Sequence, residues 1–206
     1  ISQVQVFDDI GLSFGSTLRS ILRQDPDILL IGEIRDGETA DIAVKFSLTG
    51  HLVFSTVHAN DAPGTLTRLL DIGIAPFLVG SCLNLVMAQR LVRKLCDKCK
   101  EKYKPTSEEL ELIGLKPKDV KNGFLYRAKG CADCRNTGYR GRTAIFEMIP
   151  MARELRKLVF ESANEDEIRQ AAIKNGMVTL RDAGNERVLD GTTSIEEVLR
   201  STVEDL

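Results

Sequence analysis

The first 95 residues alternate between segments with apolar residues at helical spacing and short runs that are apolar throughout. Apolar residues three or four positions apart predict an amphipathic helix, and a continuous apolar run of about four to eight residues predicts a buried strand. We therefore expect helices over residues 16–24, 36–50, 60–73 and 76–95, and strands over residues 27–33 and 51–58. Strands alternating with helices predict an α/β fold with a parallel sheet flanked by helices.

The boundaries of these segments carry the residues that usually stand there. Asp36 opens one predicted helix and Gly50 closes it. The run 27–33 is apolar up to its final Gly-Glu pair, so we expect a strand buried on both faces of the sheet. The opening stretch ISQVQV resembles the end of a strand, and because the chain starts at Ile1 rather than Met we expect it to be cut from a longer protein.

The last third of the chain has helical spacing throughout. We expect four helices, over residues 152–161, 164–176, 179–191 and 194–206. In the last of them Ser194 and Glu197 stand in capping-box register. Its predicted apolar face consists of Ile195, Val198, Leu199 and Val203. Such a helical bundle could transmit rotation or pack subunits in a ring, and a plain stabilising cap is an equally good interpretation.

Composition limits the class of protein. A hydrophobic content of 43% is enough for a core. The sequence has no run of about 18 apolar residues and no cleavable signal pattern, so it predicts a cytosolic protein that does not cross a membrane by itself.

Charge is distributed unevenly along the chain. Residues 90–142 carry 15 Lys and Arg against 7 Asp and Glu, whereas the rest carries 13 against 23. The basic stretch contains four of the five cysteines, which predicts a boundary near residue 95. The expected domains are 1–95, 96–142 and 143–206.

Two titratable residues follow the predicted strands. Glu33 ends the first strand and His58 ends the second, so parallel strands would bring both to one sheet edge, where chemistry collects in such folds. The odd spacing of His51 and His58 prevents both from facing one side of a regular strand. His58, which Asn60 and Asp61 follow at a helix start, is better placed for a ligand, and His51 could form structural hydrogen bonds at the amino-terminal end of the strand.

The cysteines predict a metal site. CDKC and CADC are two C-x-x-C motifs separated by 31 residues, and their thiolates suit tetrahedral zinc. The predicted ligands are Cys96, Cys99, Cys131 and Cys134. The separation exceeds common ribbon spacing, so the intervening loop should have its own structure. It includes Thr106 and Glu109 in capping-box register.

Other readings of the cysteines are weaker. Disulfides are disfavoured in a cytosolic protein. A redox pair is less favoured still, because two matching motifs suggest a cage. Cys82 lies in an apolar segment and is most simply a small buried hydrophobe.

The chain resembles the secretion-ATPase superfamily, hexameric motors that power type IV pilus assembly and type II secretion. The resemblance rests on LRSILRQDPDILLIGEIRDGETADIA, SLTGHLVFSTVHANDA, AQRLVRKLCDKC, GYRGRTAIFEMI and GTTSIEEVLR. These motifs are long and cover nearly the whole chain. The resemblance implies part of a RecA-like P-loop ATPase core, followed by a zinc-binding tetracysteine module and a C-terminal helical bundle.

Roles for individual residues follow from the resemblance. ILLIGE resembles a Walker B element in which the carboxylate of Glu33 orients or activates the attacking water. LTGHLVFSTVH resembles the family's histidine box, with His58 near the γ-phosphate of ATP and His51 nearby. Arg19, Arg23 and Arg35 match family arginines that stabilise phosphate charge or tie the ring together. Positioned donors and a carboxylate are what phosphoryl transfer requires.

Each of these residues also has an ordinary structural interpretation. Glu33 could be a helix-start carboxylate, a lone histidine is more often structural than catalytic, and Arg19 or Arg23 could lie in a solvated face or a salt bridge. The sequence lacks the G-x-x-x-x-G-K-[ST] loop that cradles phosphates. We therefore expect this chain alone to be inactive, because that loop and the acidic box that helps to hold Mg²⁺ precede it in the family.

The resemblance also implies partners and a location. We expect a homo-hexamer in the cytoplasm, at the inner face of the cytoplasmic membrane, that pushes a platform protein of the inner membrane and associates with the membrane peripherally through its partners. The tetracysteine module disfavours a retraction motor, and pilus assembly is only slightly favoured over type II secretion. The alternatives are a zinc ribbon that binds nucleic acid and a purely structural module. Tyr103, Phe124, Tyr126 and Tyr139 are too scattered for an evident stacking platform, so no nucleic acid is expected.

Overall fold

The computed structural model describes residues 1–202, which form parts of two compact units. The first unit consists of residues 1–86 and 149–175, and the second of residues 87–148 and those from 176 on. Both units are discontinuous in sequence, whereas each predicted domain is one continuous stretch. The chain leaves the first unit, builds most of the second, returns for two helices and then leaves again.

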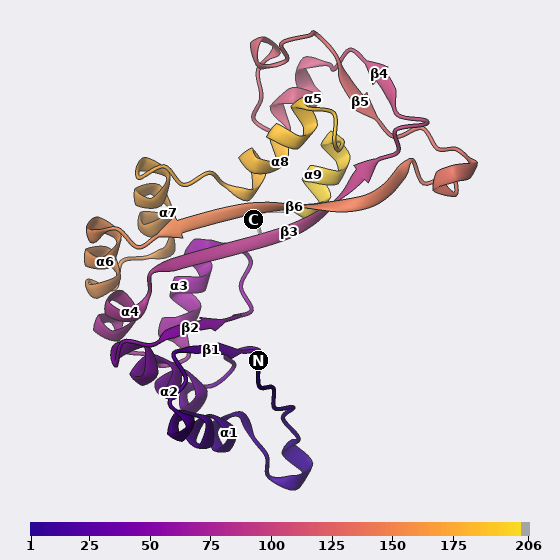
Figure 1. The fold of residues 1–206 in the computed structure, drawn as a ribbon. Coiled ribbons are helices and arrows are strands. Elements are labelled where there is room, and N and C mark those ends of the chain that lie inside the picture. The colour runs from indigo at the N-terminus through magenta and orange to yellow at the C-terminus, as the bar shows by residue number, and fades with distance from the viewer. Residues whose placement is uncertain (203–206) are drawn as a thin grey trace. The chain divides into compact units, whose positions relative to one another are not determined.

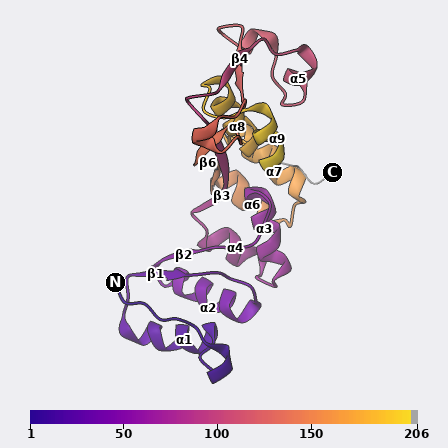
Figure 2. The ribbon, with the colours of Figure 1, turned by 90° about the vertical axis from the view of Figure 1, so that its right-hand side faces the viewer.

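The first unit begins with helices and two parallel strands in the predicted order (Figure 1). With η denoting a 3-10 helix, its elements are η1 (Asp8–Ile10), α1 (Phe14–Ile21), η2 (Leu22–Gln24), β1 (Ile28–Ile31), α2 (Gly37–Leu48), β2 (Leu52–Ser55), α3 (Ala62–Asp71) and α4 (Pro76–Cys82). β1 and β2 pair in parallel, which confirms that prediction. α2 lies between the strands and α1 in both views (Figures 1 and 2). The expected strand at residues 1–6 is absent from the described structure, and only a bridge between Phe7 and Leu12 follows.

Local side-chain caps explain where the helices begin. The Asp36 carboxylate accepts a hydrogen bond from the backbone N–H of Thr39 at 2.8 Å, at the start of α2. Asp61 accepts one from the N–H of Gly64 at the same distance, and Pro63 occupies the first turn of α3. Each cap satisfies a backbone donor that the helix itself leaves unpaired.

The prediction that β1 is buried on both faces is wrong for these residues. Leu29 and Ile31 are buried, whereas Ile28 and Leu30 are 62% and 74% exposed. Successive side chains of a strand point to opposite faces, so only one face of the β1–β2 sheet is covered by the described elements. An apolar run therefore indicated a strand correctly but not how many of its faces are covered.

The prediction of one helix over residues 76–95 is also wrong. α4 ends at Cys82, and β3 (Leu85–Leu95) pairs with β6 (Tyr139–Pro150). Along the first half of β3, exposed Leu85 and Met87 alternate with buried Val86 and Ala88. This is the two-residue period of a strand. It cannot be recognised in the sequence, because all four side chains are apolar.

The loop between the two C-x-x-C motifs has its own structure, as predicted, and includes a small sheet that was not predicted. Its elements are β4 (Glu101–Tyr103), α5 (Ser107–Glu111), η3 (Pro117–Asp119) and β5 (Leu125–Arg127), and η4 (Ala132–Cys134) follows within the second motif. β4 and β5 are antiparallel. The predicted capping box of Thr106 and Glu109 is confirmed, with both reciprocal hydrogen bonds present.

The four predicted C-terminal helices are present. They are α6 (Arg153–Phe160), α7 (Glu165–Lys174), α8 (Leu180–Leu189) and α9 (Ile195–Ser201). The first two belong to the first unit and the last two to the second. The predicted continuation of α9 through Val203 to residue 206 lies outside the described residues. No helix of the described chain is long and apolar enough to cross a membrane.

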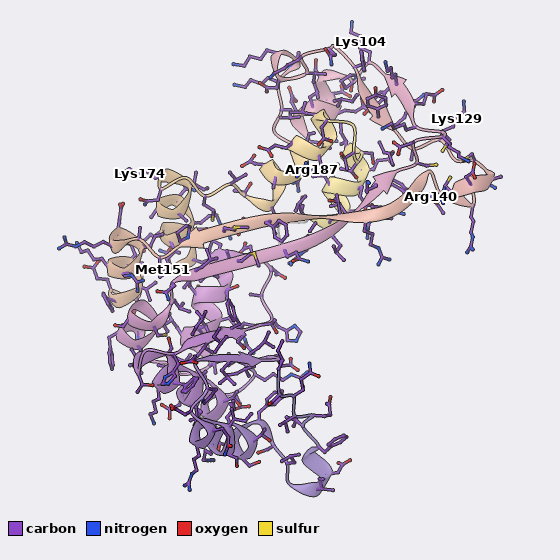
Figure 3. The ribbon with its side chains drawn as sticks, viewed as in Figure 1. Lys104, Lys129, Arg140, Met151, Lys174 and Arg187 are labelled. Carbon is purple, nitrogen blue, oxygen red and sulfur yellow. The ribbon has the colours of Figure 1, made fainter. Side chains whose placement is uncertain are left out.

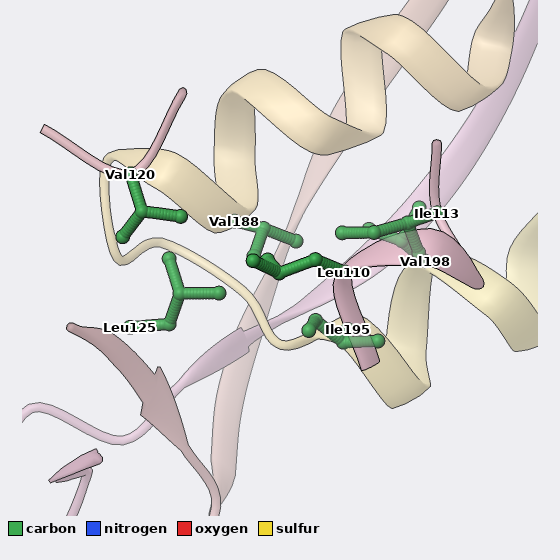
Figure 4. Packing of buried hydrophobic residues seen from close by; sticks show 7 residues of the cluster. All are labelled: Leu110, Ile113, Val120, Leu125, Val188, Ile195 and Val198. Atoms are coloured by element: carbon green, nitrogen blue, oxygen red, sulfur yellow. The ribbon is translucent and has the colours of Figure 1, made fainter. Parts of the chain in front are cut away.

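α8 and α9 close the core of the second unit (Figure 4). The buried cluster consists of Leu110, Ile113, Val120, Leu125, Val188, Ile195 and Val198. Its residues come from both the loop between the cysteine motifs and the last two helices, so segments about 80 residues apart share one core.

Only half of the predicted capping box at α9 forms. Ser194 accepts a hydrogen bond from the N–H of Glu197, as expected. The fully buried carboxylate of Glu197 instead accepts from the backbone and guanidinium of Arg93, at 2.7–2.9 Å, and from the guanidinium of Arg200. Charged donors form stronger hydrogen bonds with a carboxylate than a neutral N–H does, so they replace the cap.

Candidate functional site

The parallel strands bring Glu33 and His58 together at the carboxyl edge of the sheet, which confirms that geometric prediction. Glu33 lies two residues after β1 and His58 three residues after β2. Nε2 of His58 is 3.2 Å from Oε2 of Glu33, and the guanidinium of Arg35 is 2.5 Å from Oε1. A carboxylate, an imidazole and a guanidinium therefore meet at one edge.

The charges around Glu33 favour its ionised form. The hydrogen bond from Arg35 is the main cause that lowers the pKa of Glu33, with a further contribution from His58, while partial burial opposes the shift. The side chain of Glu33 is 21% exposed, whereas that of His58 is 85% exposed. The carboxylate is thus held as an acceptor, and the imidazole projects into open space.

Two hydrogen bonds of Thr56 fix the two loops against each other. Thr56 donates its hydroxyl to the carbonyl of Gly32 at 2.7 Å, and its own carbonyl accepts from the N–H of Ile34 at 2.9 Å. These bonds bracket Glu33 on both sides. They extend the pairing of the two strands into the loops that carry the candidate residues.

His51 lies at the other end of β2 and is not brought to Glu33. Its Nδ1 is 2.9 Å from the hydroxyl of Thr49 and 3.2 Å from the carbonyl of Phe46. The imidazole stacks on the ring of Phe46, with centroids 3.9 Å apart. These contacts match the structural interpretation of His51.

The three candidate arginines separate in the structure. Arg35 contacts Glu33, as described above. Arg19 on α1 pairs instead with Glu38 at the start of α2, with Nη1 3.0 Å from Oε1. Arg23 is exposed in η2, and its side chain has no hydrogen bond or ion pair within residues 1–202. Only Arg35 joins the pair of Glu33 and His58.

The four cysteines of the C-x-x-C motifs converge near the paired ends of β3 and β6. Their sulfur atoms all lie within 4.8 Å of one another, and the four thiols are free. Sγ–Sγ distances are 3.9 Å for Cys96–Cys131, 3.8 Å for Cys99–Cys134 and 3.7 Å for Cys131–Cys134.

This spacing fits a tetrahedral zinc ion. A Zn–S bond of about 2.3 Å sets sulfur atoms about 3.8 Å apart at the corners of a tetrahedron. Cys96 and Cys134 are buried, so the ion would be largely shielded from water. The donor set and the distances both match a closed structural site.

Backbone N–H groups stabilise the thiolate form of Cys134. Burial raises the pKa of Cys134, but the N–H groups of Cys131 and Gly138, each 3.2 Å from its Sγ, outweigh burial and lower it to about 6. Burial raises the pKa of Cys99 to about 12. Zinc would have to supply the stabilisation for that second thiolate.

Exposed lysines and arginines lie near the four cysteines in the amino-acid sequence. Lys104, Lys129 and Arg140 extend from the surface of the second unit (Figure 3). Lys98 pairs with Asp133 across the two motifs at 2.9 Å. Cys82 lies in α4 and is not part of the cluster. It is only partly buried, so the prediction of a buried hydrophobe is met in part, and this burial raises its pKa.

Sequence reasoning missed one contact near the site. Arg169 on α7 donates to Asp61, the N-cap of α3, at 2.7 Å. Asp61 was recognisable as a cap from its position before Ala-Pro-Gly. Nothing in the sequence signals that its partner lies 108 residues further on.

Residues 1–200 match the model of the family described as type II/IV secretion system protein. The chain is 52% identical over 206 residues to the type IV pilus assembly ATPase PilB of Myxococcus xanthus and covers 36% of that protein. It is 48% identical over 205 residues to the type II secretion system protein E of Pseudomonas aeruginosa and covers 40% of it. In both comparisons all of this chain is matched, and it spans well under half the length of these curated relatives.

Solved structures share the fold at low sequence identity. The pilus retraction motor PilT with bound ADP aligns with a TM-score of 0.63 at 22% identity, over 94% of this chain and 44% of that one. The ATPase DotB of Legionella pneumophila aligns with a TM-score of 0.61 at 19% identity, over 90% of this chain and 41% of that one. These likenesses concern the fold alone.

Proposed function

Because this chain belongs to the family of type II/IV secretion system proteins, we propose that it is part of an ATP-hydrolysing motor subunit. A named ATPase of type IV pilus assembly matches its full length, and a named ATPase of type II secretion matches 99% of it. In this proposal, residues 1–95 belong to a RecA-like core and supply the Walker B carboxylate and the histidine box. The phosphate-binding loop comes from outside the 206 residues, which contain no G-x-x-x-x-G-K-[ST] stretch.

The observation that carries the proposal is the meeting of Glu33, His58 and Arg35 at one edge of a parallel sheet. The ionised carboxylate of Glu33 accepts a hydrogen bond from a water molecule and orients that water toward the terminal phosphate. His58 projects into open space, where its imidazole can donate to a phosphate oxygen. Positioned donors and acceptors of this kind stabilise charge that develops during phosphoryl transfer.

Magnesium accompanies ATP in this proposal. Both carboxylate oxygens of Glu33 already have partners, Arg35 and His58, so these residues do not by themselves form a magnesium site. Arg35 neutralises the carboxylate and, on release of that ion pair, becomes a donor for phosphate. We assign no nucleotide contact to Arg19, Arg23 or His51 from their positions here.

The cysteine cluster has a structural role in the proposal. Cys96, Cys99, Cys131 and Cys134 hold a zinc ion that ties the paired ends of β3 and β6 to the loop between the motifs. A closed tetrahedral site supplies folding free energy rather than an open position for catalysis. The module supports pilus assembly or type II secretion rather than retraction.

The larger assembly belongs to the same proposal. The motor would be a hexamer in the cytoplasm that pushes a platform protein in the membrane, and the names of the relatives support a place in a pilus or secretion machine. Sequence identities of 52% and 48% to members of the two classes do not separate pilus assembly from type II secretion.

The test is Glu33→Gln in the complete protein. We expect ATP binding to persist and kcat to fall by about two to three orders of magnitude, because the amide cannot orient water as a carboxylate does. Nucleotide binding by fluorescence and phosphate release measure the two quantities separately. Glu186→Gln, an exposed glutamate on α8, is the matched control and should leave kcat unchanged. A Glu33→Gln protein with wild-type turnover would remove Glu33 from this role.

A nucleic-acid-binding zinc ribbon is the weaker candidate. The basic stretch 90–142 favours it, but cations of this chain already lie over the aromatic rings on which bases would stack. The Lys102 ammonium is 4.4 Å from the centroid of Phe124, and the Arg127 guanidinium is 5.4 Å from that of Tyr103. Salt-sensitive binding of arbitrary single-stranded DNA would restore this candidate.

A further inference from the structure

The position of His58 depends on the loop that carries it. Its side chain is 85% exposed, and the partner described for its imidazole is Glu33 at 3.2 Å. Side-chain packing therefore does little to hold the imidazole, and the backbone between β2 and α3 has to do so. At the β2 end, Thr56 fixes this loop through its bonds to Gly32 and Ile34.

At the α3 end the loop is fixed at Asp61. One carboxylate oxygen of Asp61 caps α3 through the N–H of Gly64 at 2.8 Å, and the other accepts from Nη2 of Arg169 at 2.7 Å. The same nitrogen contacts Glu165, one turn earlier on α7, at 2.7 Å. Asp61 thus links the histidine loop to a helix that is remote in sequence.

The contact between Asp61 and Arg169 differs from an ordinary surface ion pair. The two side chains are only 20% and 24% exposed, so the pair is shielded from solvent screening. α3 packs against α7, and a Cβ on Gly64 would lie 3.0 Å from Asp61 and 3.5 Å from Glu165. The backbone approaches both acids closely, which leaves little freedom at this end of the loop.

We propose that Arg169 is a positioning residue for His58, which it holds through Asp61 and the start of α3. The inference rests on the proposed function for the role of His58. It adds that a residue of α7 influences the position of this histidine. A movement of α7 relative to α3 would change where the imidazole stands. The C-terminal helices α6 and α7 would then act on the nucleotide site rather than only stabilise the unit.

The direct test uses histidine NMR on the 206-residue chain, which contains only two histidines. In Arg169→Gln the His58 ring signals should shift while those of His51, stacked on Phe46 at the other end of β2, stay in place. Asp61→Asn should reproduce the shift, because Asn is as good an N-cap as Asp and only the ion pair is lost. Glu165→Gln keeps the contact between Asp61 and Arg169 and is the control that should leave His58 unmoved.

The functional test measures ATP hydrolysis by the complete protein, below the melting temperature of each variant. Arg169→Gln and Asp61→Asn should lower kcat about tenfold with KM for ATP changed less than about twofold, and Arg169→Lys should recover part of the loss. A merely structural pair would lower Tm and leave kcat per folded subunit unchanged. Unmoved His58 signals together with wild-type kcat would overturn the inference.

His58→Ala separates failure of this inference from failure of the proposed function. If His58→Ala lowers kcat and Arg169→Gln does not, the coupling is wrong and the role of His58 stands. If His58→Ala itself leaves kcat unchanged, the proposed function of His58 fails, and the NMR shifts alone then decide whether Arg169 positions the loop.

Discussion

At the scale of single residues, Glu197 shows how far a buried charge depends on its partners. Its carboxylate is fully buried and lies between the guanidinium groups of Arg93 and Arg200. Burial raises its pKa, but these hydrogen bonds outweigh burial and lower the pKa to about 2. Replacing this carboxylate by an amide removes the charge that the two guanidinium groups, themselves 41% and 59% exposed, stabilise in the folded state.

The difference between the unfolded pKa and the folded pKa of about 2 corresponds to about 3 kcal/mol, so we expect Glu197→Gln to lower the free energy of unfolding by about that amount at pH 7. Glu196→Gln, the exposed neighbour on α9, should change it by less than about 0.5 kcal/mol. Urea unfolding of both variants measures the difference.

The effect of Glu197→Gln should depend on pH in a defined direction. The folded-state pKa of Glu197 lies below its unfolded value, so the carboxylate stabilises the fold above the unfolded pKa and this contribution is lost as pH falls toward about 2. Wild type and Glu197→Gln should converge in stability between about pH 4.5 and pH 2. A gap that stays constant across this range would contradict the assigned network.

At the scale of elements, the two cysteine motifs organise a segment that has little core of its own. Leu110, Val120 and Leu125 pack against Val188 and other residues of α8 and α9 (Figure 4). The four sulfur atoms bring the two ends of the loop together. Lys100 adds a hydrogen bond to the carbonyl of Gly191 in the loop between α8 and α9. The cysteine cluster and the last two helices therefore hold the module jointly.

We expect one zinc per chain, and its loss in Cys96→Ser with faster amide exchange in β4 and β5. Elemental analysis measures the metal, and hydrogen exchange measures the loosening. Cys82→Ser, outside the cluster, is the matched control and should retain zinc. Full zinc content in Cys96→Ser would contradict the four-cysteine site.

The element that sequence reasoning misjudged lies between residues 76 and 95. Pro76 and the apolar residues after it do form a helix, but it ends at Cys82. Leu83 is already extended, and β3 is stabilised by pairing with β6, about 50 residues further on. Apolar residues in succession suit both structures, so the strand partner decides between them.

At the scale of the whole molecule, the proposed motor requires subunits that meet around ATP. A nucleotide bound between subunits adds its binding free energy to the interface and shifts association by mass action. We expect the complete protein with ATP to sediment with the mass of six subunits, and Glu33→Gln to retain that mass because it still binds ATP. Monomers at all concentrations with saturating ATP would contradict the hexamer.

Much of the local structure and the chemistry of the candidate site could be predicted from the amino-acid sequence. Caps such as Asp36 and Thr106 act within three residues, and helical or apolar spacing acts within one element, so the elements from α1 to α4 and the last four helices were predictable, whereas β3 to β6 were not. Glu33 and His58 could be placed together because parallel strands end at one edge. The spacing of the four cysteines predicted a tetrahedral metal site.

Which distant groups meet and which faces are covered could be seen only in the folded chain. Arg169 reaches Asp61 across 108 residues, and Glu197 reaches Arg93 across 104. The open face of β1 likewise follows from which helices happen to cover the sheet. Ion pairs and packing between remote segments have no local signature, because their energy depends on distance in space and burial rather than on neighbours in sequence.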